Sequence, residues 1–317
     1  MNHAIRYKGL ADKELGILVT RGAMLRSWSA CLLLLAAAVP TSAQYSDAFV
    51  RKFFPTLFAA TESSNASSCL SKIFTDFEMK KMVTVDCDKA DGLDHCRGYT
   101  AVSHDQKVIT LNFRGTKGKL QLLVESDQTI TQQKVSWVGG GAASSYFANA
   151  FLLIWNNGMK DDFLNLVHKF PDYDVWIGGH SLGGAMAALA SSYVTGMNLV
   201  SASKIKLVTF GQPRTGDVDF ANAHDSIIPY TYRVVHKNDI VPHLPPRGLE
   251  NFRHHKSEVW YNNDMTKVDF KECDSQESPL CSDLHVDASI EDHHRYFNMY
   301  MTYYGLRDCT GDPSSSK

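Results

Sequence analysis

The 317-residue sequence lacks several features that mark common classes of protein. It carries 32 basic and 34 acidic residues, a net charge of −2, so it has no basic excess of the kind that binds nucleic acid. It contains no Cys-x-x-Cys pair and neither the His-Glu-x-x-His nor the His-x-x-Glu-His spacing of zinc enzymes. Internal repeats are absent, and the only low-complexity tract is a short serine-rich tail. These absences favour a globular protein that uses no metal and has no nucleic-acid partner.

Long apolar runs are also scarce, and the longest lies near the start of the chain. After Met24 come a basic residue, an apolar core from Ala30 to Val39, and small residues up to Ala43. This order predicts a secretory signal peptide that is cleaved after Ala43. The apolar core is short for a membrane-spanning helix, although a signal anchor is the alternative. Residues 1–23 precede this signal, either because Met24 is the true start or because the leader is unusually long.

Cleavage at that point would leave residues 44–317 as one α/β domain outside the cell, with no stable membrane span. Such a chain is also open to glycosylation, and Asn65 is the acceptor in the sequon Asn65-Ala66-Ser67.

The cysteine count supports export. Of seven cysteines, one lies in the leader, and the remaining six form an even number, which in an exported chain indicates disulfides. Two pairs are close in sequence and would each close a loop, which leaves a third pair to join the two ends of the domain. Six cysteines allow many connectivities, so the spacing alone leaves the pairing open. The pairs suggested are Cys87–Cys96, Cys273–Cys281 and Cys69–Cys309.

Helical and strand-like patterns alternate along the rest of the chain. The helices expected are 46–60, 141–170, 182–197, 216–228 and 290–304. The strands expected are 99–103, 108–113, 175–177, 205–210, 230–236 and 255–261, the last at the edge of the sheet. Residues 64–97 are expected to form a disulfide-closed surface region. Strands that alternate with helices predict an α/β fold with a mostly parallel sheet.

The segment "VWIGGHSLGGAMAAL" contains the pattern Gly-x-Ser-x-Gly around Ser181, after a predicted strand and before a predicted helix. That context is the one in which a nucleophilic serine stands on a sharp turn. Small neighbours would let the strand and the helix approach each other, and the helix N-terminus would favour an oxyanion near the Leu182 N–H. The alternative is a glycine-rich turn in which Ser181 only caps the helix.

A serine hydroxyl needs a base, which is usually a histidine oriented by a carboxylate, and in α/β hydrolases these follow in the order Ser, Asp, His. Asp239 lies just beyond the predicted strand 230–236, where catalytic groups gather in open α/β sheets. Its competitor, Asp217, lies nearer a helix start and is expected to cap it. The histidines that follow Asp239 are His243, His254, His255, His285, His293 and His294. Clustered histidines also raise a metal site as an alternative.

Several segments together resemble the class 3, fungal-type secreted triacylglycerol lipases. They are "LNFRGT", "GHSLGGAMAAL", "VTFGQPRTGDVDFA", "YRVVHKNDIVPHLPP", "SEVWY" and "DHHRYF", which occur in the family's order over roughly residues 98–300. The resemblance implies an α/β-hydrolase fold with Ser181 as nucleophile, Asp239 as orienting acid and His293 as base. His293 is selected because the family places its histidine directly after an aspartate and three residues before a tyrosine, here Asp292 and Tyr296. The family's three-disulfide pattern agrees with the pairing suggested above.

The resemblance also implies the surroundings of the site. The family places an oxyanion residue after Phe-Arg-Gly, which here is Thr116, and its N–H would act together with that of Leu182. A short lid follows in the family. The corresponding segment here has no tryptophan, and its apolar spacing fits a helix and a strand about equally well, so an ordinary buried element is the alternative to a lid. The lid candidates are Lys119, Leu120, Leu122, Leu123 and Val124.

The function implied is that of a secreted serine esterase that cleaves acylglycerols through an acyl-enzyme, without metal or organic cofactor. Its partner would be a lipid ester substrate, met at a lipid–water interface if the lid operates. The same residues would serve a phospholipase A1, or an esterase for feruloyl or short-chain esters. A catalytically silent lipid-binding protein on the same scaffold is the alternative from a different class.

Overall fold

The computed structural model describes residues 44–87, 95–115, 133–284 and 287–316. The chain divides into two units, residues 1–41 and 42–317, and every helix and strand given below belongs to the second. The predicted leader lies outside the described residues. Within the described ranges, no helix is both long enough and apolar enough to cross a membrane.

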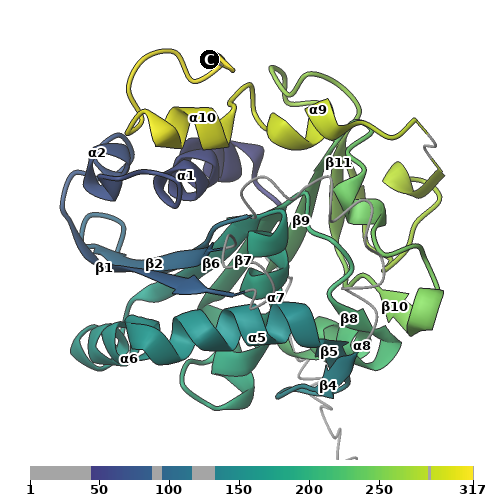
Figure 1. The fold of residues 1–317 in the computed structure, drawn as a ribbon, viewed down its shortest axis with the longest axis horizontal. Coiled ribbons are helices and arrows are strands. Elements are labelled where there is room, and N and C mark those ends of the chain that lie inside the picture. Colours follow the sequence, from purple (N-terminus) through teal and green to yellow (C-terminus); the bar gives the residue numbers. More distant parts are fainter. Residues whose placement is uncertain (1–43, 88–94, 116–132, 285–286, 317) are drawn as a thin grey trace, which may run out of the picture. The chain divides into compact units, whose positions relative to one another are not determined.

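An eight-stranded sheet with the order β1-β2-β3-β6-β7-β9-β11-β12 runs through the second unit (Figure 1). The strands are β1 (Phe77–Asp86), β2 (His95–Ser103), β3 (Val108–Phe113), β6 (Asp174–His180), β7 (Ile205–Phe210), β9 (Thr231–His236), β11 (Glu258–Tyr261) and β12 (Lys271–Cys273). The five strands from β3 to β11 are parallel, and the strands at both ends of the sheet pair antiparallel. The predicted mostly parallel α/β sheet is therefore confirmed.

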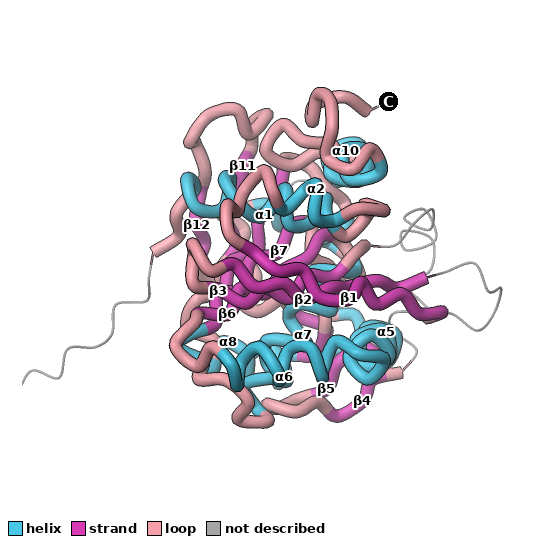
Figure 2. The backbone as a smooth tube through the Cα atoms, turned by 90° about the vertical axis from the view of Figure 1, so that its left-hand side faces the viewer, coloured by secondary structure: helices cyan, strands magenta, loops and turns pink. Residues whose placement is uncertain are grey.

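Helices cover both faces of this sheet (Figure 2). One layer holds α1 (Asp47–Ala60), α2 (Ala66–Leu70) and α10 (Met301–Leu306). The other holds α5 (Ser145–Ile154), α6 (Lys160–Lys169), α7 (Leu182–Gly196) and α8 (Val218–Ile227). The short helix α9 (Ile290–His294) precedes α10 in the chain.

The two layers create two apolar cores. Because successive side chains of a strand point to opposite faces, Trp176 of β6 lies in the core beneath α1, and Ile177 lies in the core beneath α7. A strand that is buried on both faces has a nearly continuous apolar sequence, as the central strands here do. Helix α7 is rich in alanine and glycine and is buried along most of its length, which lets it pack closely against the sheet.

A smaller sheet has the order β10-β8-β5-β4, from β10 (Phe252–Arg253), β8 (Gly216–Asp217), β5 (Ala142–Ser144) and β4 (Lys134–Ser136). Asp217 at its centre accepts a hydrogen bond from the Phe220 N–H at 2.9 Å, so it caps α8 as predicted. Short 3-10 turns occur at Ala202–Lys204, Val241–His243, Leu249–Asn251 and Ser282–Leu284.

Two predictions about strands were wrong. The region 64–97 was expected to form a disulfide-closed surface region, and Cys87–Cys96 does close part of it, but the prediction missed α2, the whole of β1 and the start of β2. Strand β1 pairs with β2 and carries a register shift between Met79 and Met82, which interrupts the alternation on which strand prediction depends. Residues 255–261 were expected at the edge of the sheet, but β12 pairs with β11 and takes the edge position.

Two predicted helices are interrupted. The segment 141–170 forms β5, α5, a π-type turn at Trp155–Met159 and α6, because Gly158 adopts φ +130° in the middle. The segment 290–304 forms α9 and α10, separated by a turn in which Phe297 and Asn298 have positive φ. The predicted helices at 46–60, 182–197 and 216–228 are confirmed as α1, α7 and α8, within two residues at each end.

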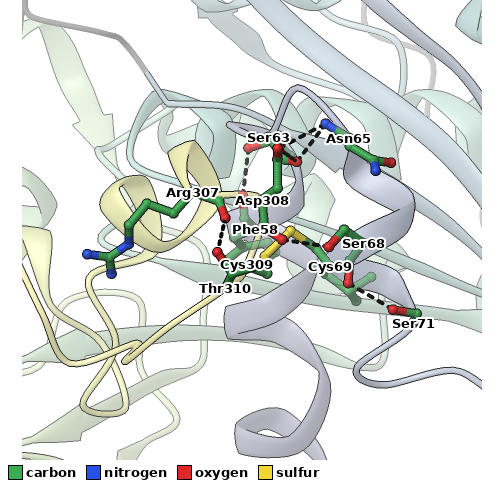
Figure 3. Close-up of a disulfide and its surroundings, with 12 residues drawn as sticks. Phe58, Ser63, Asn65, Ser68, Cys69, Ser71, Arg307, Asp308, Cys309 and Thr310 are labelled. Atoms are coloured by element: carbon green, nitrogen blue, oxygen red, sulfur yellow. Dashed lines mark hydrogen bonds between the residues drawn. A yellow bond between two sulfur atoms is a disulfide. The ribbon is translucent and has the colours of Figure 1, made fainter.

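All three suggested disulfides are present: Cys69–Cys309, Cys87–Cys96 and Cys273–Cys281. The first joins α2 to the segment after α10 (Figure 3). Beside it, the Asp308 carboxylate accepts hydrogen bonds from the Ser63 hydroxyl at 2.6 Å and the Asn65 N–H at 3.0 Å. The Ser68 hydroxyl donates to the Asp308 carbonyl at 2.7 Å. The disulfide and these bonds hold the two ends of the domain together.

Candidate active site

Ser181 occupies the turn between β6 and α7, with φ 60° and ψ −130°. A positive φ is uncommon for a residue with a side chain and marks a strained position. The Ser181 side chain makes no capping hydrogen bond to the helix, so the helix-cap alternative is not supported. The backbone is fixed instead, since the Ser181 N–H donates to the Phe210 carbonyl at 2.9 Å.

The glycines around Ser181 are needed for space. A Cβ atom on Gly179 would lie 2.3 Å from the backbone of Gly183, and a Cβ on Gly183 would lie 2.2 Å from the Phe113 carbonyl oxygen. Real Cβ atoms do not approach other atoms this closely. The strand, the helix and the end of β3 therefore meet at the serine only because these positions lack side chains, as the sequence predicted.

Asp239 lies three residues beyond the end of β9 and is fully buried. Its carboxylate accepts hydrogen bonds from the Val241 N–H at 2.9 Å, from the Tyr296 hydroxyl at 2.5 Å, and from His293 Nδ1, which is 2.9 Å from each oxygen. Burial alone would raise the pKa of Asp239, but the charge and hydrogen bond of His293, with the Tyr296 and Val241 bonds, hold it below its usual value. Asp239 is thus an ionised, buried carboxylate.

His293 belongs to α9 and is 1% exposed. Because Asp239 accepts the proton of Nδ1, the other ring nitrogen, Nε2, is left as the basic one. The neighbouring His294 has no hydrogen bond to Asp239, and its ring centroid lies 6.1 Å from that of His293. Of the two adjacent histidines, only His293 pairs with the carboxylate.

The carboxyl ends of the central strands bring these groups together. Phe210, which receives the Ser181 N–H, ends β7, and the next residue is Gly211. A Cβ on Gly211 would lie 2.7 Å from Asp239 Oδ2 and 2.8 Å from His293 Nδ1. The Ser181 backbone and the Asp239–His293 pair therefore both lie against one short segment, Phe210–Gly211.

His180, next to the serine, gives a second link. Its ring lies 4.3 Å from the His293 ring, and its Nε2 donates to the His293 carbonyl at 2.8 Å. Burial, followed by the charge of His293, keeps the pKa of His180 well below its usual value, so His180 is neutral. The turn that carries Ser181 (the elbow) and helix α9, which carries His293, are thus joined by a partly buried hydrogen bond.

The oxyanion and lid predictions are only partly within the described residues. Leu182 is the first residue of α7, so its N–H has no acceptor within the helix. Thr116 lies outside the described residues, but Gly115 before it is close to the elbow, since a Cβ there would lie 3.2 Å from Ser181 Cβ. The lid candidates Lys119, Leu120, Leu122, Leu123 and Val124 also lie outside the described residues.

One cluster among the described residues has the composition of a metal site. His224, Asp225 and His255 bring their ligand atoms within 4.8 Å of one another. Hydrogen bonds within the protein already engage each side chain. His224 contacts the Ser191 hydroxyl at 3.2 Å, and His255 contacts Gln212 at 3.1 Å. Asp225 accepts from the backbone N–H of Lys256 at 2.9 Å and from the Gln276 amide at 2.7 Å. These bonds account for Asp225, for His255 and for Nε2 of His224, whereas Nδ1 of His224 is buried and has no hydrogen-bond partner among the described residues.

Two groups at the site were not predicted as functional residues. Tyr296 donates to Asp239, and His180 donates to His293. Tyr296 was noted only as a marker of the family, and His180 only as the variable position of the serine motif. The available signal was position in the sequence, since Tyr296 follows shortly after His293 and His180 directly precedes Ser181, but the hydrogen bonds depend on tertiary packing.

The sheet order and the strand–turn–helix at Ser181 define an α/β-hydrolase fold. Residues 110–249 match the model of the class 3 lipase family. The chain is 33% identical over 307 residues to a lipase of Caenorhabditis elegans, covering 87% of this chain and 85% of that protein. It is 34% identical over 220 residues to a lipase of Rhizopus niveus, covering 65% of this chain and 52% of that protein, so it spans about half the length of this relative.

The solved structure of the Rhizomucor miehei triacylglyceride lipase superposes with a TM-score of 0.68 at 28% identity, covering 80% of this chain and 96% of that one. The chain belongs to the class 3 lipase family, and it is a carboxylic ester hydrolase of the lipase type.

Proposed function

We propose that the mature protein is exported and cleaves acyl ester bonds of lipids, with Ser181 as nucleophile, His293 as general base and Asp239 as orienting acid. The observation that carries this proposal is the buried Asp239–His293 pair, which lies at the strand ends beside the elbow of Ser181. Triacylglycerol is the proposed substrate class, since the Rhizomucor relative is described as a triacylglyceride lipase.

The proposed reaction uses protein groups and water alone. His293 Nε2 removes the hydroxyl proton of Ser181, and the oxygen attacks the ester carbonyl. The N–H groups of Leu182 and Thr116 stabilise the oxyanion, and such a donor contributes about 3–4 kcal/mol. His293 then protonates the leaving alcohol, which leaves an acyl-enzyme. Water, activated by the same histidine, releases the fatty acid.

The proposal includes where the substrate is met. An apolar segment with Leu120, Leu122, Leu123 and Val124 follows the oxyanion residue and would act as a lid that opens at a lipid–water interface. Assays of triolein, phosphatidylcholine and p-nitrophenyl esters, below and above the solubility limit of each lipid, test this. A rate that rises sharply above the limit supports interfacial opening, and preference for phosphatidylcholine would replace triacylglycerol as the substrate class.

Export is proposed from the leader and the disulfides together. Three disulfides are typical of chains that mature in an oxidising compartment. Cleavage after Ala43 would leave 44–317 as a single domain, and the exposed Asn65 would be its glycosylation site. Sequencing the N-terminus of protein recovered from the medium tests this. A start at Gln44 supports it, and a membrane-bound chain that retains residues 24–43 contradicts it.

The decisive test of the chemistry is replacement of the nucleophile. Ser181→Ala should abolish hydrolysis of long-chain esters and covalent labelling by a fluorophosphonate, because the substitution removes the proposed nucleophile. Ser226→Ala, at an exposed serine of α8, is the matched control and should leave both unchanged. Full activity in Ser181→Ala, or a folded wild type that takes up no label, would refute the proposal.

A further inference from the structure

The segment that begins at Asp239 is held by two side chains from elsewhere in the chain. The Val241 N–H donates to the Asp239 carboxylate, and the next carbonyl, that of Pro242, accepts from His254 Nε2 at 2.7 Å. Farther along, the Pro245 carbonyl accepts from Arg214 Nη1 at 2.9 Å. The direction of the Asp239 carboxylate therefore depends on a segment that His254 and Arg214 hold in place.

Both of these residues are bound by one carboxylate, that of Glu277. Arg214 donates to it with Nε at 2.9 Å and with Nη2 at 2.8 Å, and the two side chains are each 2% exposed. The backbone N–H of His254 donates to the same carboxylate at 2.9 Å. This fork-to-fork geometry fixes the guanidinium plane, which in turn aims Nη1 at Pro245.

Glu277 is itself anchored. It lies between Cys273 and Cys281, whose disulfide closes a short segment next to β11 and β12. Burial opposes its ionisation, but the hydrogen bonds and charge of Arg214 outweigh burial and lower the pKa of Glu277. Glu277 therefore remains an ionised carboxylate over the pH range in which lipases are assayed, and it keeps its two hydrogen bonds from Arg214.

We propose that Glu277 is a positioning residue for the reaction, which orients Asp239 through Arg214, His254 and the segment Pro242–Pro245. This inference rests on the proposed function, since it assumes that Asp239 orients His293. Glu277 touches neither substrate nor the reacting atoms. Its effect should therefore appear in turnover and in the pH profile, and not in substrate binding.

The first test is Glu277→Gln, with Glu272→Gln, on the exposed edge strand β12 directly before Cys273, as the matched control. An amide accepts from Arg214 with only one oxygen, so the guanidinium and Pro245 should shift. Measured on a soluble short-chain ester, kcat per fluorophosphonate-titrated site should fall about 10- to 100-fold with little change in KM.

The acidic limb of the kcat/KM profile of Glu277→Gln should move to lower pH, because a displaced Asp239 stabilises the imidazolium of His293 less. Glu272→Gln should match the wild type.

A second variant separates positioning from stability. Arg214→Met combined with Glu277→Leu leaves no unpaired charge from this pair, so its melting temperature should be closer to that of the wild type than in Glu277→Gln. Its kcat should nevertheless stay low, because the Pro245 carbonyl loses the guanidinium from which it accepts, and only the backbone N–H of residue 214, which donates to the Leu244 carbonyl, remains there. If kcat recovers together with stability, or if Glu277→Gln keeps wild-type turnover and pH profile, the positioning role is refuted while Ser181 chemistry stands. If the wild type takes up no fluorophosphonate, both this inference and the proposed function fail.

Discussion

At the scale of single residues, two aspartates with little exposed side chain have pKa values shifted in opposite directions because their neighbours differ. Burial raises the pKa of both. For Asp239, His293, Tyr296 and the Val241 N–H outweigh burial, and its pKa is lowered. For Asp283, the nearby charges of Glu277 and Glu258 add to burial, and the pKa rises to about 6 although Arg214 lies 3.6 Å away. Asp239 thus stays ionised beside the histidine, whereas Asp283 holds its proton in weakly acidic solution.

The raised pKa of Asp283 predicts a pH dependence of stability. The pKa of an aspartate in the unfolded chain is about 3.9, below the folded value of about 6. The stabilising contribution of the protonated form is therefore fully present below the unfolded pKa and is lost as the pH rises through about 6. Asp283→Asn resembles the protonated carboxyl and should not show this loss. The free energy of unfolding of Asp283→Asn, minus that of the wild type, should therefore increase between about pH 4 and pH 7. Urea unfolding of both proteins across this range measures the difference.

Asp269→Asn, at an exposed aspartate, is the control for that series and should follow the wild type at every pH. A constant difference between Asp283→Asn and the wild type across the range would contradict the prediction. That result would mean that Asp283 titrates alike in the folded and unfolded chain.

The same scale shows which site residues the sequence could predict. Ser181 stands in a local pattern of glycines, and Asp239 follows a strand end, so both have signals in their immediate neighbours. His293 needed the family resemblance, because several histidines follow Asp239. The Arg214–Glu277 pair joins residues 63 positions apart through a buried ion pair, and no local pattern encodes such a contact.

At the scale of elements, the elbow depends on contact between α7 and the ends of β3 and β6. The nearest obstacles to a side chain at Gly183 are backbone atoms, the carbonyl oxygen and carbon of Phe113 at 2.2 Å and 2.8 Å. At Gly184 the nearest atom is Gln212 Cβ, part of a side chain, at 3.1 Å. The two adjacent glycines therefore differ in what a methyl group would displace.

This difference predicts opposite results for two alanine substitutions. Gly183→Ala must push α7 away from β3 and should cost about 1–3 kcal/mol or more, with loss of fluorophosphonate labelling. Gly184→Ala should change the free energy of unfolding by less than about 1 kcal/mol, because alanine is favoured in a helix by a similar amount and offsets the tighter contact. Chemical denaturation and labelling rates of both variants check this, and similar effects in the two would be evidence against the backbone contact.

Elements with an uninterrupted pattern were predicted well, and interrupted ones were not. The strand β7 was predicted with its observed ends, because Ile205–Phe210 is a short, mostly apolar run in which only Lys206 is charged. Strand β1 is half-exposed and shifts register within its length, so neither periodicity nor composition marked it. The helical patterns are broken at Gly158 and Phe297 by residues with positive φ. The helix-like spacing of apolar residues was read straight across both positions, so the breaks were not predicted.

At the scale of the whole domain, the two ends of the described chain are bound to its body and to each other. Helices α1 and α10 lie in one layer, and Cys69–Cys309 links residues 240 positions apart. At the start of α1, the Asp47 carboxylate accepts a hydrogen bond from the Tyr261 hydroxyl at 2.5 Å. The Tyr45 hydroxyl lies 3.1 Å from the same Tyr261 hydroxyl. Closing a loop of this length removes much conformational freedom from the unfolded chain.

Chain entropy and catalytic geometry predict different consequences for two of the disulfides. The cross-link across 240 positions should stabilise the fold by roughly 5 kcal/mol, and Cys273–Cys281, across 8 positions, by roughly 2–3 kcal/mol. Replacing Cys69 and Cys309 by serine should therefore cause the larger loss of stability, while the molecules that remain folded keep their turnover per labelled site. Replacing Cys273 and Cys281 should cost less stability but lower kcat, because Glu277 lies within that closed segment and would no longer be held against Arg214.

Urea unfolding and kcat per fluorophosphonate-titrated site, measured on both double variants, give the comparison. The expectation fails if the variant that loses more stability also loses more turnover per site.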